Sequence, residues 1–157
     1  MEKFPITKDG FERLEFELKN LKSIERPSVI KSIAEAREHG DLSENAEYHA
    51  AKEKQSFIEG RIADLESKIS RAEVINTGSL SSDKVIFGAT VTLGDIDSNK
   101  NLIYQIVGTE EADVENGKIS ISSPLARALL GKKIDDTVEV YSPGGSKEYE
   151  IENIEFI

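Results

Sequence analysis

Residues 51–72 read AKEKQSFIEGRIADLESKISRA, and this stretch decides the architecture of the chain. Residues suited to a helix seam recur in it at alternating spacings of four and three. They are Ala51, Gln55, Ile58, Ile62, Leu65, Ile69 and Ala72. A heptad pattern held for this length predicts a helix whose apolar side packs along a second helix.

The partner helix is predicted in the residues that come before this stretch. Thr7 is a suitable N-cap, and an apolar stripe follows it. The stripe consists of Phe11, Leu14, Leu18 and Leu21, then Val29, Ile30, Ile33 and Ala34. Pro27 either kinks this helix or opens its second half, and His39-Gly40 ends it. Because few residues separate the two helices, they must run antiparallel, as a hairpin roughly 46 Å long over residues 8–38 at about 1.5 Å per residue.

The residue period changes after the hairpin. The polar, aperiodic sequence NTGSLSSDK predicts a linker over residues 77–84. Beyond it, apolar residues alternate as in half-buried strands. The alternating sets are Val85, Phe87, Ala89, Val91 and Leu93; Leu102, Tyr104 and Ile106; Ile119 and Ile121; Val138 and Val140; and Tyr149 and Ile151. Ile154 and Phe156 have the opposite parity, which predicts a bulge in the last strand.

Turn and helix signals complete the second domain. Turns are predicted at Asp97-Ser-Asn, Glu115-Asn-Gly and Pro143-Gly-Gly. The segment from Ser123 to Gly131 predicts one short helix with an N-cap, a proline at its first position and a glycine at its end. We therefore predict an α+β chain. It has a coiled-coil hairpin over residues 1–76 with an acidic tip at 40–47, and a small antiparallel sheet domain over 85–157.

Composition excludes several classes of protein. The 157 residues are 32% charged and 38% hydrophobic, and none is a cysteine. There is no apolar run of the ~20 residues that a membrane helix needs and no secretory signal, so we expect a cytoplasmic protein without membrane contact. The net charge is -10. A protein that binds nucleic acid by itself usually carries a basic surface, so a third molecule must arrange any such contact here.

The predicted tip, Gly40-Asp-Leu-Ser-Glu-Asn-Ala-Glu47, concentrates acidic side chains. Asp41 and Glu44 are three residues apart where the second helix begins, a spacing that favours a capping box. Two exposed carboxylates also offer the oxygen ligands that Mg²⁺ prefers, but they would be only half a site because the ion takes six oxygens. The two histidines, without cysteine, do not complete a zinc site, and no motif of a self-contained active site is present.

A resemblance to a known family is carried by IAEAREHGDLSENAEYHAAKEKQ (residues 33–55). The sequences EGRIADLESKI, VIFGATVTL, SPLARALLGK and PGG extend it over the whole chain. The chain resembles bacterial Gre transcript-cleavage factors, specifically the GreA type. The resemblance implies that the sheet domain is FKBP-like and docks at the rim of the secondary channel of RNA polymerase, while the hairpin enters the channel.

The resemblance also implies roles for individual residues. Asp41 and Glu44 would help hold the second Mg²⁺ of the polymerase, which then cleaves the 3′ end of backtracked RNA and so rescues arrested complexes. Arg37 and Lys52 would contact the RNA. The polymerase-binding surface would include Ser122, Ser123, Pro124 and Leu125. The chain would not be an enzyme itself, would bind no cofactor alone and would act as a monomer.

Two other functions remain open at this point. The chain would be a binding module if it occupied the channel without promoting cleavage. It would be a prolyl isomerase or chaperone if the FKBP-like domain were active, but the few aromatic residues of that domain predict no aromatic-lined pocket, so we expect no such activity.

Overall fold

The computed structural model describes residues 2–41 and 44–157, which form two compact units. One unit is Phe11–Arg71, and the other joins the residues up to Gly10 with Ala72–Ile157. This division differs from the predicted boundary at residue 76. Its cause is a two-stranded parallel sheet in which β1 (Phe4–Thr7) pairs with β2 (Ala72–Ile75). Both ends of the hairpin sequence therefore belong to the unit that contains the larger sheet.

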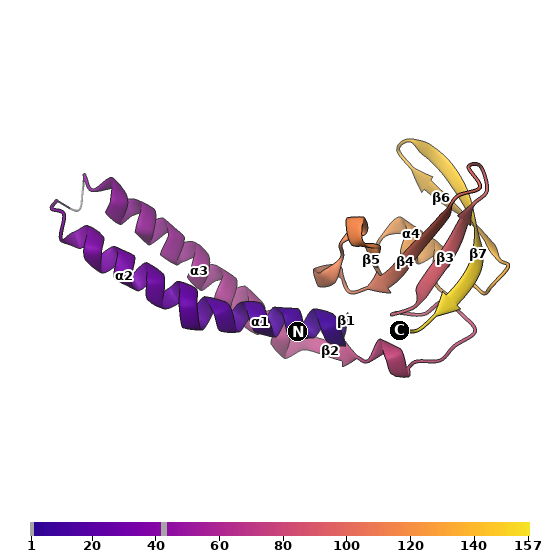
Figure 1. Cartoon of the computed structure of the whole chain (residues 1–157), viewed down its shortest axis with the longest axis horizontal. Helices are drawn as coiled ribbons and strands as arrows, with labels where there is room; N and C mark the ends of the chain where they lie inside the picture. Colours follow the sequence, from indigo (N-terminus) through magenta and orange to yellow (C-terminus); the bar gives the residue numbers. More distant parts are fainter. Residues whose placement is uncertain (1, 42–43) are drawn as a thin grey trace. The chain divides into compact units, whose positions relative to one another are not determined.

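The hairpin unit has the predicted antiparallel arrangement (Figure 1). Its first arm comprises α1 (Lys8–Asn20), a π-helical segment (Leu21–Glu25) and α2 (Arg26–Arg37), and its second arm is α3 (Ala46–Arg71). The heptad seam of α3 is confirmed at its centre, where Ile58, Ile62 and Leu65 are buried, but its last predicted member, Ala72, instead begins β2. Ile58 and Ile62 form a cluster with Val29, around which Leu18 and Leu21 pack.

The π-helical segment explains how the first arm passes Pro27. The proline ring removes the N–H that would bond to the carbonyl of Ser23, so regular α-helical bonding is interrupted there. Instead, the Arg26 N–H donates to the carbonyl of Leu21, five residues earlier. Val29 follows Leu21 by eight residues, one more than a heptad. A π turn holds more residues than an α turn, and it therefore absorbs the extra residue and keeps both side chains on α3.

The apolar stripe of α2 differs from the prediction at two positions. Val29 and Ala36 are buried, whereas Ile30 is 52% exposed and Ala34 is also exposed. The prediction of Ile30 and Ala34 as seam residues is wrong because the stripe after the π segment follows spacings of four and three from Val29. Ile33, half-buried, lies on that stripe.

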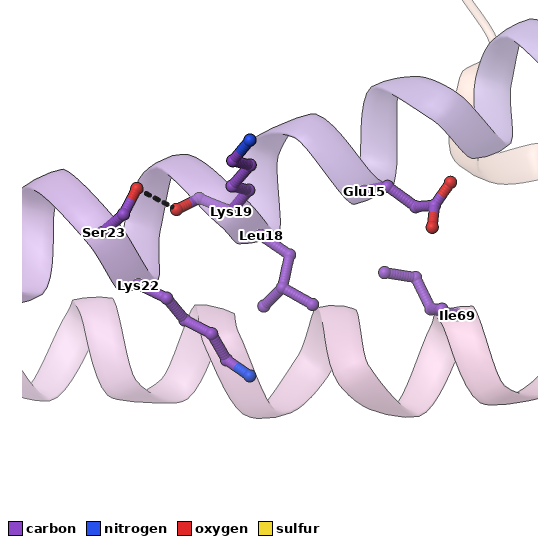
Figure 2. A pocket seen from close by; sticks show the side chains of 6 residues that line it. All are labelled: Glu15, Leu18, Lys19, Lys22, Ser23 and Ile69. Atoms are coloured by element: carbon purple, nitrogen blue, oxygen red, sulfur yellow. Dashed lines mark hydrogen bonds between the residues drawn. The ribbon is translucent and has the colours of Figure 1, made fainter.

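The seam is more open between α1 and α3. Figure 2 shows Leu18 and Ile69 extending into the space between the two helices, with Glu15 and Lys22 on either side, while the Lys19 side chain points away from α3. These residues and Ser23 line a hollow of about 420 Å³. The Ser23 hydroxyl donates to the carbonyl of Lys19 at 2.6 Å, so its hydrogen bond is made within the first arm of the hairpin.

Ion pairs flank the seam along both arms. Arg61 donates to both carboxylate oxygens of Glu17, at 2.6 and 2.9 Å, and Arg26 makes the same forked contact with Glu59, at 2.8 Å to each oxygen. The hydrogen bonds from Arg61 lower the pKa of Glu17, and those from Arg26 lower the pKa of Glu59. Forked guanidinium contacts fix geometry as well as charge, so these pairs help to set the register of the two arms.

Acidification is expected to remove the contribution of the Glu17 pair. A carboxylate whose pKa is lowered by folding stabilises the protein above its ordinary pKa, here 4.5, and that contribution is lost as the pH falls through the lowered value. Because the pair is partly exposed, Glu17→Gln should cost at most about 1 kcal/mol at neutral pH. Urea unfolding at several pH values should show the variant and the wild type converging in strong acid. The same difference at every pH would contradict this assignment, and Glu12→Gln, at an exposed position, is the control.

The larger sheet has the strand order β5-β4-β3-β7-β6 (Figure 1). Its strands are β3 (Thr90–Asp95), β4 (Asn101–Val107), β5 (Lys118–Ser120), β6 (Thr137–Ser142) and β7 (Gly145–Glu155). Four strands pair antiparallel, as predicted, but β5 runs parallel to β4, so the sheet is mixed. Short 3₁₀ helices at Thr77–Ser79, Thr109–Glu111 and Val114–Asn116 occupy the connections.

The predicted details of this sheet are largely confirmed. The register of β3 against β7 shifts between Thr92 and Leu93, which leaves Glu152 as the extra residue of the predicted bulge. The two hairpin turns and the Glu115-Asn-Gly turn lie at the predicted positions, and Gly117 and Gly145 have the positive φ that such turns require. The predicted strand from Val85 begins only at Thr90, although Val85 and Ala89 are buried in the core.

Helix α4 (Pro124–Leu129) packs against the sheet. Ser123 caps it as predicted, since its hydroxyl accepts the Ala126 N–H at 3.2 Å. Ala126 and Leu129 are fully buried in the sheet core. Nowhere in the part of the chain that the structure describes is a helix long and apolar enough to cross a membrane.

Candidate functional site

Asn45 organises the described part of the hairpin tip. Its side-chain oxygen accepts the Tyr48 N–H at 3.0 Å, and its backbone carbonyl accepts the His49 N–H, so Asn45 is the N-cap of α3. Its side-chain amide also donates to the carbonyl of Ala36 in the last turn of α2, at 2.5 Å. One residue thus starts the second arm of the hairpin and ties it to the end of the first.

This arrangement decides where the cap of α3 lies. The spacing of Asp41 and Glu44 favoured a capping box at the start of the second helix, but α3 begins at Ala46 and Asn45 occupies the N-cap position. Both tip carboxylates precede the helix. The sequence signal for the cap was present, because asparagine is among the preferred N-cap residues. The spacing of the acidic residues Asp41 and Glu44 instead favoured a capping box formed by these two side chains.

Asp41 and Glu44 are both exposed and line the same open hollow of about 490 Å³. His39, Asn45, Ala46 and Glu47 also line it. The structure therefore brings the two predicted metal-ligating residues to one place. Exposed carboxylate oxygens fit the chemistry of Mg²⁺, and their position at a surface leaves room for ligands from another molecule. Leu42 and Ser43, which belong to the predicted tip, lie outside the described residues.

Other titratable groups surround this hollow. His39 Nε2 lies 3.9 Å from a carboxylate oxygen of Glu47, and both side chains are mostly exposed. Within residues 2–41 and 44–157, no group of three or more His, Asp or Glu side chains is arranged to hold a metal ion.

Loss of the Asn45 cap is expected to weaken the hairpin. Asn45→Ala removes the bond to the Tyr48 N–H and the bond to the Ala36 carbonyl, and a cap of this kind contributes about 1 kcal/mol. Asn45→Asp keeps an oxygen for the cap but has no amide to donate to Ala36, so its loss should be smaller. Thermal unfolding followed by circular dichroism measures both variants. Equal stability of Asn45→Ala and the wild type would contradict this role.

The two predicted RNA-contacting residues are exposed. Arg37 is the last residue of α2, and Lys52 lies in the second turn of α3. Lys52 Nζ donates to Gln55 Oε1 at 3.3 Å, a contact within its own helix. Both cations are thus on the helical arms whose ends Asn45 joins.

The predicted polymerase-binding residues lie where β5 leads into α4. Ser122 and Pro124 are exposed, whereas Ser123 is occupied in capping and Leu125 packs partly against the sheet core. The Ser120 and Ser122 hydroxyls lie 2.8 Å apart, and Ser120 also reaches Thr109 at 3.1 Å. The exposed part of this prediction is therefore a small patch of hydroxyls beside Pro124.

Two further hollows among the described residues differ from the tip in their lining. The hollow in Figure 2 has an aliphatic floor and no pairing of a nucleophile with a base. The hollow beside the β3–β4 turn is polar and acidic, and the carboxylate of its most buried member, Asp95, accepts the backbone N–H groups of Asp97 and Ser98. That carboxylate shapes the turn.

Known proteins resemble this chain over its whole length. The family models that match are "Transcription elongation factor, N-terminal" over residues 4–74 and "Transcription elongation factor, GreA/GreB, C-term" over residues 80–156. Transcription elongation factor GreA of Rhodospirillum rubrum is 61% identical, over 99% of both chains. The factor of the same name from Beijerinckia indica is 62% identical, again over 99% of both chains.

Solved structures also match. GreA factor homolog 1 of Thermus thermophilus is 32% identical and covers 98% of this chain and 99% of its own, with a TM-score of 0.45. A GreA/GreB elongation factor from Nitrosomonas europaea is 25% identical over 98% of this chain and 100% of its own, with a TM-score of 0.43. From the two family models and the full-length relatives, the chain belongs to the GreA/GreB family of bacterial transcription elongation factors and is of the GreA type.

Proposed function

We propose that this chain binds RNA polymerase, enters its secondary channel with the hairpin tip and stimulates cleavage of the 3′ end of backtracked RNA. The observation that carries this proposal is the placement of Asp41 and Glu44. Both are exposed and line one hollow at the tip, while Asn45 provides the N-cap of α3. Their position leaves them accessible to a second molecule.

The chemistry of an incomplete site supports a role as cofactor of the polymerase. Two carboxylates supply only part of the six oxygen ligands of Mg²⁺, and the polymerase would supply the remainder. A Mg²⁺ ion bound there would lower the pKa of an attacking water and stabilise charge on the phosphate. The contribution of Asp41 and Glu44 is to bring negative oxygens to that point at the end of two helices that Asn45 joins.

Charge supports a protein partner for most of the surface. The chain carries a net charge of -10, so free nucleic acid would be repelled over most of it. Arg37 and Lys52 are exposed cations on α2 and α3 and would contact the extruded RNA. Ser122 and Pro124 would belong to the surface that docks on the polymerase. Such a factor would act in the cytoplasm, as a monomer, and would cleave nothing by itself.

The test uses bacterial elongation complexes arrested by backtracking, with RNA labelled at its 5′ end. Addition of the purified chain and Mg²⁺ should shorten the RNA from its 3′ end and allow synthesis to resume. The same RNA without polymerase should stay intact. Binding to the polymerase without shortening would replace this proposal by that of a channel-occupying binding module, and cleavage of free RNA would contradict it.

A further inference from the structure

Glu111 is a buried carboxylate that the proposed chemistry at the tip does not use. It ends the 3₁₀ helix that follows β4, and it is only 8% exposed. One of its oxygens accepts the Thr7 N–H at 2.7 Å and the Gly108 N–H at 2.9 Å, and the other accepts the Thr7 hydroxyl. A carboxylate so deeply buried is costly unless its oxygens are hydrogen-bonded, and here both are.

Thr7 links this carboxylate to the first turn of α1. The Gly10 N–H donates to the Thr7 hydroxyl oxygen at 3.1 Å, which is the predicted N-cap bond. The proton of the same hydroxyl goes to Glu111. Gly10, Thr7 and Glu111 therefore form one chain of donors and acceptors, and the cap of α1 is held in place from the sheet unit.

Two glycines make room for this carboxylate. A Cβ on Gly10 would overlap the carboxylate of Glu111, and a Cβ on Gly108 would lie 2.5 Å from the carbonyl of Pro5. Neither position lies at a turn that needs a positive φ. The glycines are required here because the backbone of α1 and of the 3₁₀ helix approach the carboxylate closely. The close packing at the two glycines and the hydrogen bonds to the carboxylate both indicate a specific contact between Glu111 and the first turn of α1.

We propose that Glu111 is a positioning residue for transcript cleavage, which it serves by fixing the first turn of α1 through Thr7 and Gly10. The proposal rests on the proposed function, since the hairpin that begins at this turn carries the tip carboxylates. A loose first turn would leave the start of this arm unfixed, and small misplacements of catalytic groups are costly. Glu111 itself is buried, so its side chain is not part of the surface proposed to dock on the polymerase.

The first test measures backbone hydrogen exchange in the full chain. Glu111→Gln should raise the exchange rates of the Thr7, Gly10 and Gly108 amides on the order of tenfold or more, because charged acceptors hold amides most strongly. Glu115→Gln removes the same charge from an exposed site nearby and should leave these rates unchanged. Unchanged exchange in Glu111→Gln would overturn the proposal, whatever happens to RNA.

The second test separates positioning from docking. For Glu111→Gln, the cleavage rate at saturating factor should fall about tenfold or more while the half-saturating factor concentration stays within about twofold. Thr7→Ser, which keeps the hydroxyl, should cleave like the wild type, and Thr7→Val should behave like Glu111→Gln. Wild-type rates in Glu111→Gln, or a loss explained by weaker binding alone, would overturn the positioning role. Failure of the wild type to promote cleavage would instead overturn the proposed function, and the exchange rates would still decide whether the contact exists.

A glycine pair provides a matched control. Gly10→Ala should reproduce the faster exchange at Thr7, although alanine is the better helix former. Gly60→Ala in α3 places the same methyl group in open space, since no atom outside its own stretch of helix lies within 4 Å of it, and should leave exchange at Thr7 unchanged. Equal effects of the two substitutions would contradict the close approach of Gly10 to Glu111.

Discussion

Replacement of Asp41 and Glu44 together by alanine is expected to abolish RNA shortening, with a fall in rate on the order of a hundredfold or more. The two side chains line one exposed hollow at the hairpin tip, and the proposal gives them to a Mg²⁺ ion shared with the polymerase. Their loss would leave the ion short of ligands in the reaction. Binding to the polymerase should persist, because the sheet unit is unchanged.

Two controls make this result interpretable. Thermal unfolding should be nearly unaffected by the double substitution, because the N-cap of α3 is Asn45. A second double variant, Glu12→Ala with Glu53→Ala, removes two exposed acidic side chains from the hairpin away from the tip and should cleave like the wild type. Full cleavage by the Asp41 and Glu44 variant would contradict the proposed mechanism. An equal loss of cleavage rate in the control variant would contradict it as well.

The second large effect is expected at the hairpin seam. Ile62 is 2% exposed and packs with Val29 and Ile58, so Ile62→Ala should lower the free energy of unfolding by about 2–5 kcal/mol. Phe57 belongs to the same helix but is 75% exposed, and Phe57→Ala should change stability by no more than about 0.5 kcal/mol. Urea unfolding followed by far-ultraviolet circular dichroism measures both.

The comparison of these two residues tests the register of the hairpin. If Phe57→Ala were the more damaging substitution, the seam would run along a different side of α3. Since the two arms carry the tip, the Ile62 variant should also lose cleavage at temperatures where the hairpin begins to unfold, and should recover it on cooling.

Local patterns predicted most of the hairpin. The heptad seam of α3 and the cap at Thr7 were readable because each depends on residues close together in the sequence. The shift of the stripe on α2 was not, since it arises from a π turn that the fold adopts around Pro27. A strict helical period across that turn places Ile30 in the seam, where the structure has it 52% exposed.

Contacts between residues far apart in the sequence could not be predicted from local patterns. Thr7 and Glu111 are 104 residues apart, and a single glutamate in a loop gives no sign that it will be buried. The pairing of β1 with β2 and the parallel pairing of β4 with β5 likewise join segments that no turn signal connects. At the tip, local spacing assigned the helix cap to Asp41, whereas Asn45 caps α3 and the two carboxylates line one hollow before it.

The Mg²⁺ dependence of RNA shortening tests the central claim most directly. Arrested complexes would be titrated with Mg²⁺ in the presence of the wild type, Asp41→Asn or Glu44→Gln, each at saturating concentration. If the two carboxylates are metal ligands, the half-saturating Mg²⁺ concentration should rise on the order of tenfold or more in each variant. The same half-saturating concentration for all three proteins, with only the maximal rate reduced, would contradict the claim.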